Sequence, residues 1–268
     1  MENSRGNLKV RLVIAVVVAV GAIFGYFRST QKNQITGEVQ QVALTEDQEV
    51  ALGQQAAPQM LQQYGGESSD PKENARVDQI GNRLVKQSAA RNSKYQFEFH
   101  VLNDQKTINA FALPGGQIFI TRALLSQLKT DGQVAGVLGH KIGHVIGRHG
   151  AEHMAKQNLT QGLVSAVGVG ADSQQAAQLA AAIGNLVNMK YGRDDELESD
   201  TLGVRFMSEA GYNPQAMIGV MEVLAQASKG NRNPEFFSTH PNPENRIDKI
   251  KAAIQEKFPQ GVPATLEK

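Results

Sequence analysis

A single apolar stretch decides how this chain is organised, and it reads Val134-Ala-Gly-Val-Leu-Gly-His-Lys-Ile-Gly-His-Val-Ile-Gly-Arg-His149. His140 and His144 are four residues apart on a helical pattern, so both imidazoles project from one face, one turn apart. Burying two imidazoles among aliphatic side chains costs free energy unless they have partners, and one metal ion could serve both. Glycines at 136, 139, 143 and 147 weaken the helix, which predicts close approach of another helix or a substrate.

One residue in the stretch contradicts the chemistry that this spacing usually serves. The zinc-protease motif H-E-x-x-H has the same histidine spacing and uses its Glu as general base. Lys141 stands at the Glu position. A protonated Lys has no hydrogen-bond acceptor and is repelled by a dication, so we expect Lys141 to swing away or to lose its proton. Loss of a general base costs roughly 10²–10⁴ in rate.

A zinc site also needs a third protein ligand and an open position. Glu196 and Asp200 are four residues apart at the start of a later helical segment, Arg193-Asp-Asp-Glu-Leu-Glu-Ser-Asp200. Glu196 could bind the metal while Asp200 orients a ligand histidine. Acidic residues in a first turn also suit the helix dipole without any metal. The two interpretations are equally good on the local pattern, and pairing with the histidine helix favours the ligand interpretation.

Composition narrows the possible chemistry. The 268 residues can form one medium domain with an appendage. A net charge of +1 gives no electrostatic argument for nucleic acid. The chain has no cysteine, which excludes disulfides, a cysteine nucleophile and thiolate metal ligands. Any metal must therefore be bound by carboxylates and by some of the six histidines.

The N-terminal region predicts a membrane segment. Residues 1–11 are polar and basic, and residues 12–27 are uncharged and almost entirely apolar. A cleaved signal peptide is one interpretation. Bulky residues to the end of the run, with Tyr26 and Phe27 beside Arg28, favour an uncleaved signal anchor. We expect a cytoplasmic N-terminus, a single pass through the inner membrane, and a large C-terminal part facing the periplasm or cell exterior. Residues 28–44 are then a linker.

The rest of the chain predicts a mainly helical α+β domain over residues 45–257. Capping signals at Thr45 and Asp70 predict two helix starts, and residues 95–102 alternate like a half-buried strand. Residues 109–121 read as two short strands around a Pro-Gly-Gly turn. Residues 159–188 indicate helices of small residues, and the tail 258–268 should be loose.

Four ordered motifs resemble metallopeptidase family 48, the zinc endopeptidases of the HtpX, CAAX prenyl protease and periplasmic quality-control type. The resemblance covers roughly residues 45–255. Its motifs are the edge strand in 109–121, the metal helix with Lys141 as a departure, the R-x-x-E-x-x-A-D signature with Ser199 in place of Ala, and Ser238-Thr-His-Pro-Asn-Pro-Glu-Asn-Arg246.

This resemblance implies a zincin-like fold with a small sheet and one Zn²⁺. It implies His140, His144 and Glu196 as ligands, Asp200 as the residue that supports them, and His240 as a regulatory fourth ligand. A turn residue ordered by its prolines is the other interpretation of His240. A substrate peptide should add as a strand beside Asn109, Ala110 and Phe111. We expect structural or exposed positions for the remaining histidines, His100, His149 and His153.

Two functional hypotheses follow. The first is a zinc metalloendopeptidase that cleaves unfolded or misassembled envelope proteins, with its activity impaired by Lys141; the quality-control role comes from the resemblance. The second is an inactive pseudoprotease that binds clients as a chaperone-like module. A buried, metal-free histidine pair remains the structural alternative to both.

Overall fold

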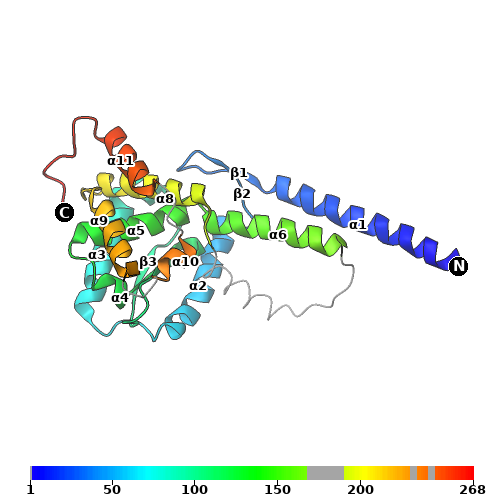
Figure 1. The fold of residues 1–268 in the computed structure, drawn as a ribbon, viewed down its shortest axis with the longest axis horizontal. Coiled ribbons are helices and arrows are strands. Elements are labelled where there is room, and N and C mark those ends of the chain that lie inside the picture. The colour runs from blue at the N-terminus through cyan, green and yellow to red at the C-terminus, as the bar shows by residue number, and fades with distance from the viewer. Residues whose placement is uncertain (1, 168–189, 230–233, 241–244) are drawn as a thin grey trace.

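The computed structural model describes residues 2–167, 190–229, 234–240 and 245–268, without the side chains of residues 1–12, 162 and 164–167. Helices dominate the described chain (Figure 1). Its elements, in chain order, are α1 (Glu2–Arg28), β1 (Thr30–Lys32), β2 (Val39–Gln41), α2 (Glu46–Gln63), α3 (Pro71–Gln87), η1 (Ala89–Asn92), β3 (Glu98–Leu102), β4 (Ala110–Ala112), η2 (Pro114–Gly116), β5 (Gln117–Thr121), α4 (Arg122–Leu125), α5 (Asp131–Ile146), α6 (His149–Val167), α8 (Arg193–Glu209), α9 (Ala216–Lys229), α10 (Phe236–Thr239) and α11 (Arg246–Lys257).

A three-stranded sheet has the order β3-β5-β4, so β4 lies at its edge. Strand β3 pairs parallel to β5, with Phe99 opposite Ile118, and β4 pairs antiparallel to β5, with Phe111 opposite Phe119. The Pro-Gly-Gly turn forms η2, where Gly115 has φ +82° and its missing side chain lets the α2 backbone approach. The predicted pair of short strands around this turn is confirmed.

Helix α5 lies at the centre of the core, because nearly every one of its residues is buried. It packs against α3, α8 and α9, and its closest partner is α8. A Cβ at Gly139 would lie 3.5 Å from Gly203 of α8, and one at Gly143 would lie 2.8 Å from the Ser199 carbonyl oxygen. The glycines therefore allow the two backbones to come close, as their spacing predicts.

Capping residues start the helices where the sequence predicts. Thr45 forms a full capping box with Gln48 at α2, and the Asp70 side chain accepts from the Lys72 N–H at α3. Thr130 caps α5 by accepting from the Gln133 N–H. The short helix α4 follows β5 directly and ends at Leu125, and the Thr121 side chain caps it by accepting from the Leu124 N–H.

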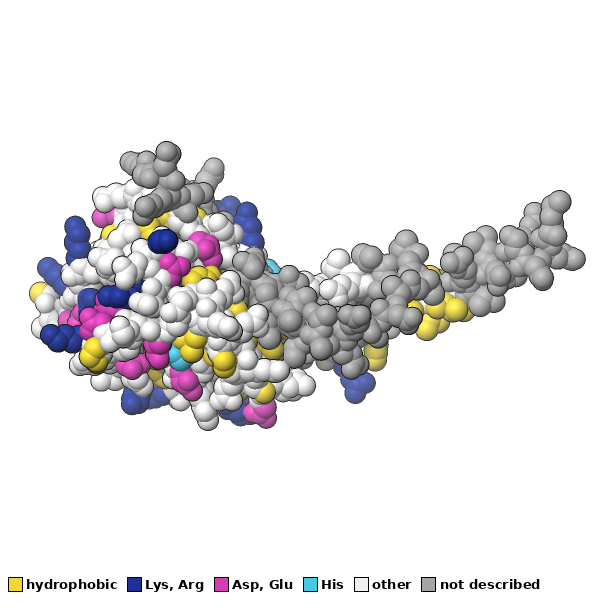
Figure 2. All heavy atoms as spheres, turned by 90° about the horizontal axis from the view of Figure 1, so that it is seen from below, with side chains coloured by type: hydrophobic (Ala, Val, Ile, Leu, Met, Phe, Trp, Pro, Cys, Tyr) yellow, Lys and Arg dark blue, Asp and Glu magenta, His cyan; other side chains and the backbone are white. Residues whose placement is uncertain are grey.

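Helices α1 and α6 run side by side and extend away from the body (Figure 1). Hydrophobic side chains are exposed on this arm, where Figure 2 shows them, and Val17 and Phe24 are each 64% exposed. The predicted transmembrane anchor over residues 12–27 lies within α1, but the structure does not support it. Among the described residues, no helix combines the length and the apolarity that crossing a membrane requires.

Two segments differ from the sequence expectation. Residues 28–44, expected as a linker, contain the β1–β2 hairpin, which is fixed to the end of α5 by Asn33 donating to the Ile146 carbonyl. The tail 258–268, expected to be loose, is held by backbone hydrogen bonds between Glu267 and both Gly211 and Asn213. Of the small-residue helices expected over 159–188, α6 covers the first part, and residues 168–189 lie outside the described chain.

Candidate metal centre

The two histidines of α5 meet as their spacing predicts. His140 and His144 are each 3% exposed, and their Nε2 atoms are 3.1 Å apart. Two nitrogens bound to one zinc ion at about 2.0–2.1 Å would have a comparable separation. Because burial lowers the pKa of both imidazoles well below the ordinary value, both are neutral at pH 7 and can act as ligands.

Helix α8 brings two carboxylates to this histidine pair. Glu196 lies with Oε1 3.3 Å from His144 Nε2 and with Oε2 3.6 Å from His140 Nε2. Asp200, one turn later, accepts from His140 Nδ1–H at 2.8 Å, which leaves the lone pair of His140 on Nε2. Burial alone would raise the pKa of Glu196, but the histidines, His240 foremost, hold it well below the ordinary value. Glu196 is therefore an ionised, acceptor-only group.

His240 follows α10 and completes a buried group of four candidate ligands with His140, His144 and Glu196, whose ligand atoms lie within 4.8 Å of one another. Its Nδ1–H donates to Glu196 Oε1 at 2.7 Å. The histidine that the resemblance implies as a regulatory ligand thus lies among the candidate ligands.

Lys141 points into the same centre. Its side chain is fully buried, with Nζ 2.7 Å from His240 Nε2 and 4.3 Å from the centroid of the Phe236 ring. Since His240 Nδ1 donates to Glu196, His240 Nε2 accepts from the Lys141 amine. Burial lowers the pKa of Lys141 well below its ordinary value, which favours the neutral amine. Within this structure the Lys141 side chain therefore points into the centre rather than away from it.

Arg246, at the start of α11, is a central residue to which the sequence analysis assigns no role. Its side chain is fully buried, and its guanidinium donates to Asp200 Oδ2 at 2.6 Å and to Asp200 Oδ1 at 2.9 Å. Nη1 also lies 3.0 Å from Glu196 Oε2. The only signal in the sequence is its place as the last residue of the Ser238–Arg246 motif.

The donor set fits a zinc ion. Nitrogen and carboxylate oxygen are the ligands that zinc prefers, and three or four of them are within reach here. Glu196 Oε2 is buried 3.6 Å from His140 Nε2, and its one cationic neighbour among the described residues is Arg246 Nη1 at 3.0 Å, so the carboxylate is held ionised beside the imidazoles. The Nε2 atoms of His140 and His144 face each other with no proton donor between them.

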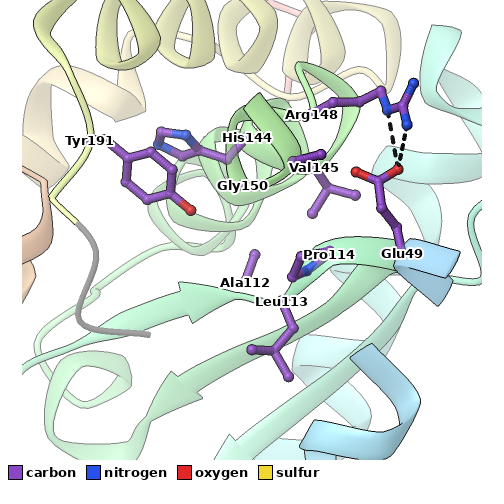
Figure 3. A pocket seen from close by; sticks show the side chains of 10 residues that line it. Glu49, Ala112, Leu113, Pro114, His144, Val145, Arg148, Gly150 and Tyr191 are labelled. Carbon is purple, nitrogen blue, oxygen red and sulfur yellow. Dashed lines mark hydrogen bonds and ion pairs between the residues drawn. The ribbon is translucent and has the colours of Figure 1, made fainter. Parts of the chain in front are cut away.

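The substrate residues predicted in 109–111 lie on or beside the edge strand, and Phe111 lines a small pocket with Lys141, His144 and His240. Asn109 donates to Glu235, and the Phe111 ring stacks on Phe119 in the core. Ala112, the next residue, lines a pocket with His144 and Tyr191 (Figure 3). The end of β4 at Phe111 and Ala112 is therefore the part of the sheet edge that borders the centre.

Tyr191 is a further residue that the sequence analysis does not single out. Its ring stacks on His144 with centroids 4.0 Å apart and on His240 with centroids 4.8 Å apart. In Figure 3 the ring covers His144 and the hydroxyl points toward the pocket. The remaining histidines differ from one another: His149 is buried against His144, while His100 and His153 pair with Gln117 and Asp195.

Comparison with known proteins agrees with this geometry. The sequence profile of peptidase family M48 matches residues 71–254. The beta-barrel assembly-enhancing protease of Escherichia coli is 31% identical over 189 residues, which cover 67% of this chain and 38% of that protein. The mitochondrial metalloendopeptidase OMA1 of Schizosaccharomyces pombe is 28% identical over 249 residues, which cover 91% of this chain and 72% of that protein. This chain spans about two fifths of the length of the Escherichia coli relative. Because the family profile covers more than half of its residues, the chain belongs to peptidase family M48.

Proposed function

We propose that this chain binds one zinc ion through His140, His144 and Glu196 and is built as a metalloendopeptidase. The observation that carries the proposal is the convergence of these three buried side chains, with the Glu196 carboxylate facing both imidazoles. Bound zinc supplies a Lewis acid for the scissile carbonyl and for the attacking water. His240 is the fourth candidate ligand, and its release from the centre would leave the open position that a catalytic site needs.

The chain's own residues orient the ligands but supply no carboxylate base beside His140. Asp200 holds His140, and Arg246 holds Asp200 while it balances part of the negative charge of Glu196. Lys141 occupies the position from which a Glu would take the proton of the attacking water, and its amine donates to His240 instead. We therefore propose that peptide hydrolysis by this chain is slow.

The proposed substrates are misfolded or misassembled envelope proteins. Bacterial relatives named as beta-barrel assembly-enhancing proteases, from Escherichia coli and Vibrio cholerae, support this class of substrate. Strand β4 is the edge of its sheet, and the backbone at its half-buried residue Ala112 could form hydrogen bonds with an extended peptide such as an unfolded chain presents. The envelope location of this chain is part of the same proposal.

Metal analysis of the purified chain tests the centre. We expect one zinc per chain, and we expect His144→Ala or Glu196→Ala to abolish stoichiometric binding because each removes a ligand. His153→Ala is the matched control, since His153 is also a helical histidine paired with a carboxylate but lies outside the centre. A chain that takes up no zinc, or a Glu196→Ala variant with unchanged affinity, would refute the ligand assignment.

A second candidate function is non-catalytic client binding. It is favoured by one observation, the Lys141 amine held against His240 where a general base is needed. Two assays on the same protein distinguish these functions: casein hydrolysis with added zinc, and binding of an unfolded protein. Binding without turnover, in both the unmodified chain and a chain whose general base is restored, supports the client-binding function.

A further inference from the structure

The turn that follows α5 places His149 in contact with the candidate ligand His144. The helix stops at Ile146, Gly147 follows, and Arg148 takes a left-handed conformation with φ +58°. The chain thereby turns back, and the ring of His149, which is 1% exposed, comes to lie against His144. A Cβ at position 147 would lie 2.6 Å from His149 Nε2, so glycine leaves the room that this ring needs.

The left-handed Arg148 is held by the surrounding structure. A positive φ is unfavourable for a residue with a side chain and persists where other contacts enforce it. The Arg148 guanidinium bonds the Glu49 carboxylate, Gln31 Oε1 and the Leu44 carbonyl oxygen. Three separate segments therefore hold the turn that directs His149 toward the centre.

The hydrogen bonds of His149 assign its protons. His149 Nε2 lies 3.1 Å from Glu198 Oε2, and an ionised carboxylate can only accept, so Nε2–H is the donor. With the proton on Nε2, the lone pair of the ring is on Nδ1, which lies 2.8 Å from His144 Nδ1. His144 must donate across that contact, so its own lone pair is on Nε2 and faces His140 Nε2 and Glu196.

The geometry points to His149, oriented by Glu198, as a positioning residue that fixes the metal-binding tautomer of His144. This inference rests on the proposed zinc centre. In this arrangement a carboxylate orients each of the two proposed ligand histidines. Asp200 accepts directly from His140, whereas Glu198 acts on His144 through the ring of His149. Ser199 Oγ, 3.3 Å from His149 Nδ1, adds a weaker contact at the same atom.

Substitutions at residue 149 separate this role from packing. In His149→Asn the new amide oxygen takes the place of Nδ1 and can accept from His144, whereas His149→Ala offers no acceptor. We expect His149→Ala to weaken zinc binding roughly tenfold to a hundredfold, the usual effect of losing a partner that orients a ligand. His149→Asn should stay near the affinity of the unmodified chain, and His153→Asn on the same helix should be unchanged. Competition with a chromophoric chelator measures each affinity.

A second measurement requires neither metal nor mutation. In ¹⁵N spectra of the metal-free chain of 268 residues, the proton of His144 should be on Nδ1 and that of His149 on Nε2. A His144 proton on Nε2 would overturn the inference, as would a folded His149→Ala variant that binds zinc as tightly as the unmodified chain. Equal losses in His149→Ala and His149→Asn would show that packing matters rather than the acceptor. If the unmodified chain binds no zinc, the proposed centre fails, and the spectra alone decide the role of His149.

Discussion

The decisive residue in this chain is Lys141, because it changes the chemistry of the centre without replacing any of the three proposed ligands. Its amine takes the site of a carboxylate base and donates to His240, which in turn donates to Glu196. The sequence shows the substitution, but only the structure shows that Lys141 bonds His240 while staying fully buried. A lysine is tolerated there because burial favours its neutral form and His240 satisfies it.

Lys141→Glu should raise peptidase activity at least about tenfold, the smallest gain expected from a restored general base. The new carboxylate can accept the proton of the attacking water, and it removes an amine from beside the metal, so zinc affinity should also rise modestly. Hydrolysis of casein or of an unfolded envelope protein, with zinc saturating, measures the effect. Lys141→Ala is the control, because it removes the amine without supplying a base.

Two results would contradict this account of Lys141. If Lys141→Ala recovers as much activity as Lys141→Glu, the amine itself was the obstacle rather than the absent base. If the unmodified chain is a fast peptidase that Lys141→Glu destroys, the amine has a catalytic role that the contact with His240 does not reveal. An inactive Lys141→Glu variant with zinc bound would favour the client-binding function.

At the scale of elements, the contact between α5 and α8 determines whether the ligands meet. Gly143 faces the Ser199 backbone, and Gly203 of α8 faces the amide of His140, so neither helix could approach as closely with larger side chains. This contact brings Glu196 and Asp200, about sixty positions along the chain, next to the histidines. The metal centre is therefore a consequence of helix packing as much as of the histidine motif.

Gly143→Ala tests this packing directly. Its Cβ would lie 2.8 Å from the Ser199 carbonyl oxygen, so the helices must separate, and we expect both a lower unfolding free energy and weaker zinc binding. Gly139→Ala, one turn earlier on α5, is the matched control. Its Cβ meets its neighbours at 3.5 Å, an ordinary contact, and the gain in helix propensity of up to about 1 kcal/mol should offset any cost. Equal urea midpoints and zinc affinities for the two variants would contradict the role of the close contact.

The sequence predicts those parts of the fold and centre that depend on local patterns. The helical spacing gives the histidine pair, the caps at Thr45 and Asp70 give helix starts, and the turn in 109–121 gives the sheet edge. Arg246 and Tyr191 could not be found in this way, because their roles depend on contacts between distant segments. The sequence gives no more for His149 than a structural or exposed position, because the left-handed turn at Arg148 is not visible in the apolar pattern.

At the scale of the whole molecule, the buried pair of Glu49 and Arg148 ties the N-terminal segments to the metal helix. Glu49 of α2 is 2% exposed and accepts from Tyr95 and from Arg148, while Arg148 also reaches Gln31 and Leu44. The same pair closes one end of the pocket beside His144 (Figure 3). Because this network holds the turn that positions His149, we expect the β1–β2 hairpin and the metal centre to unfold in one cooperative step.

Glu49 should make the stability of the whole chain depend on pH. Burial raises the pKa of Glu49 from 4.5 to about 7, although Arg148 opposes the shift. The folded chain therefore binds this proton more tightly than the unfolded chain, so the stabilisation is complete below about pH 4.5 and is lost as the pH rises through about 7. We expect the unfolding free energy of the unmodified chain to fall across this window relative to Glu49→Gln, by at most about 1.4 kcal/mol per pH unit. Urea unfolding of both chains at several pH values between 4.5 and 8 measures the difference, and parallel curves would show that Glu49 is already ionised throughout, with Arg148 rather than burial controlling its charge.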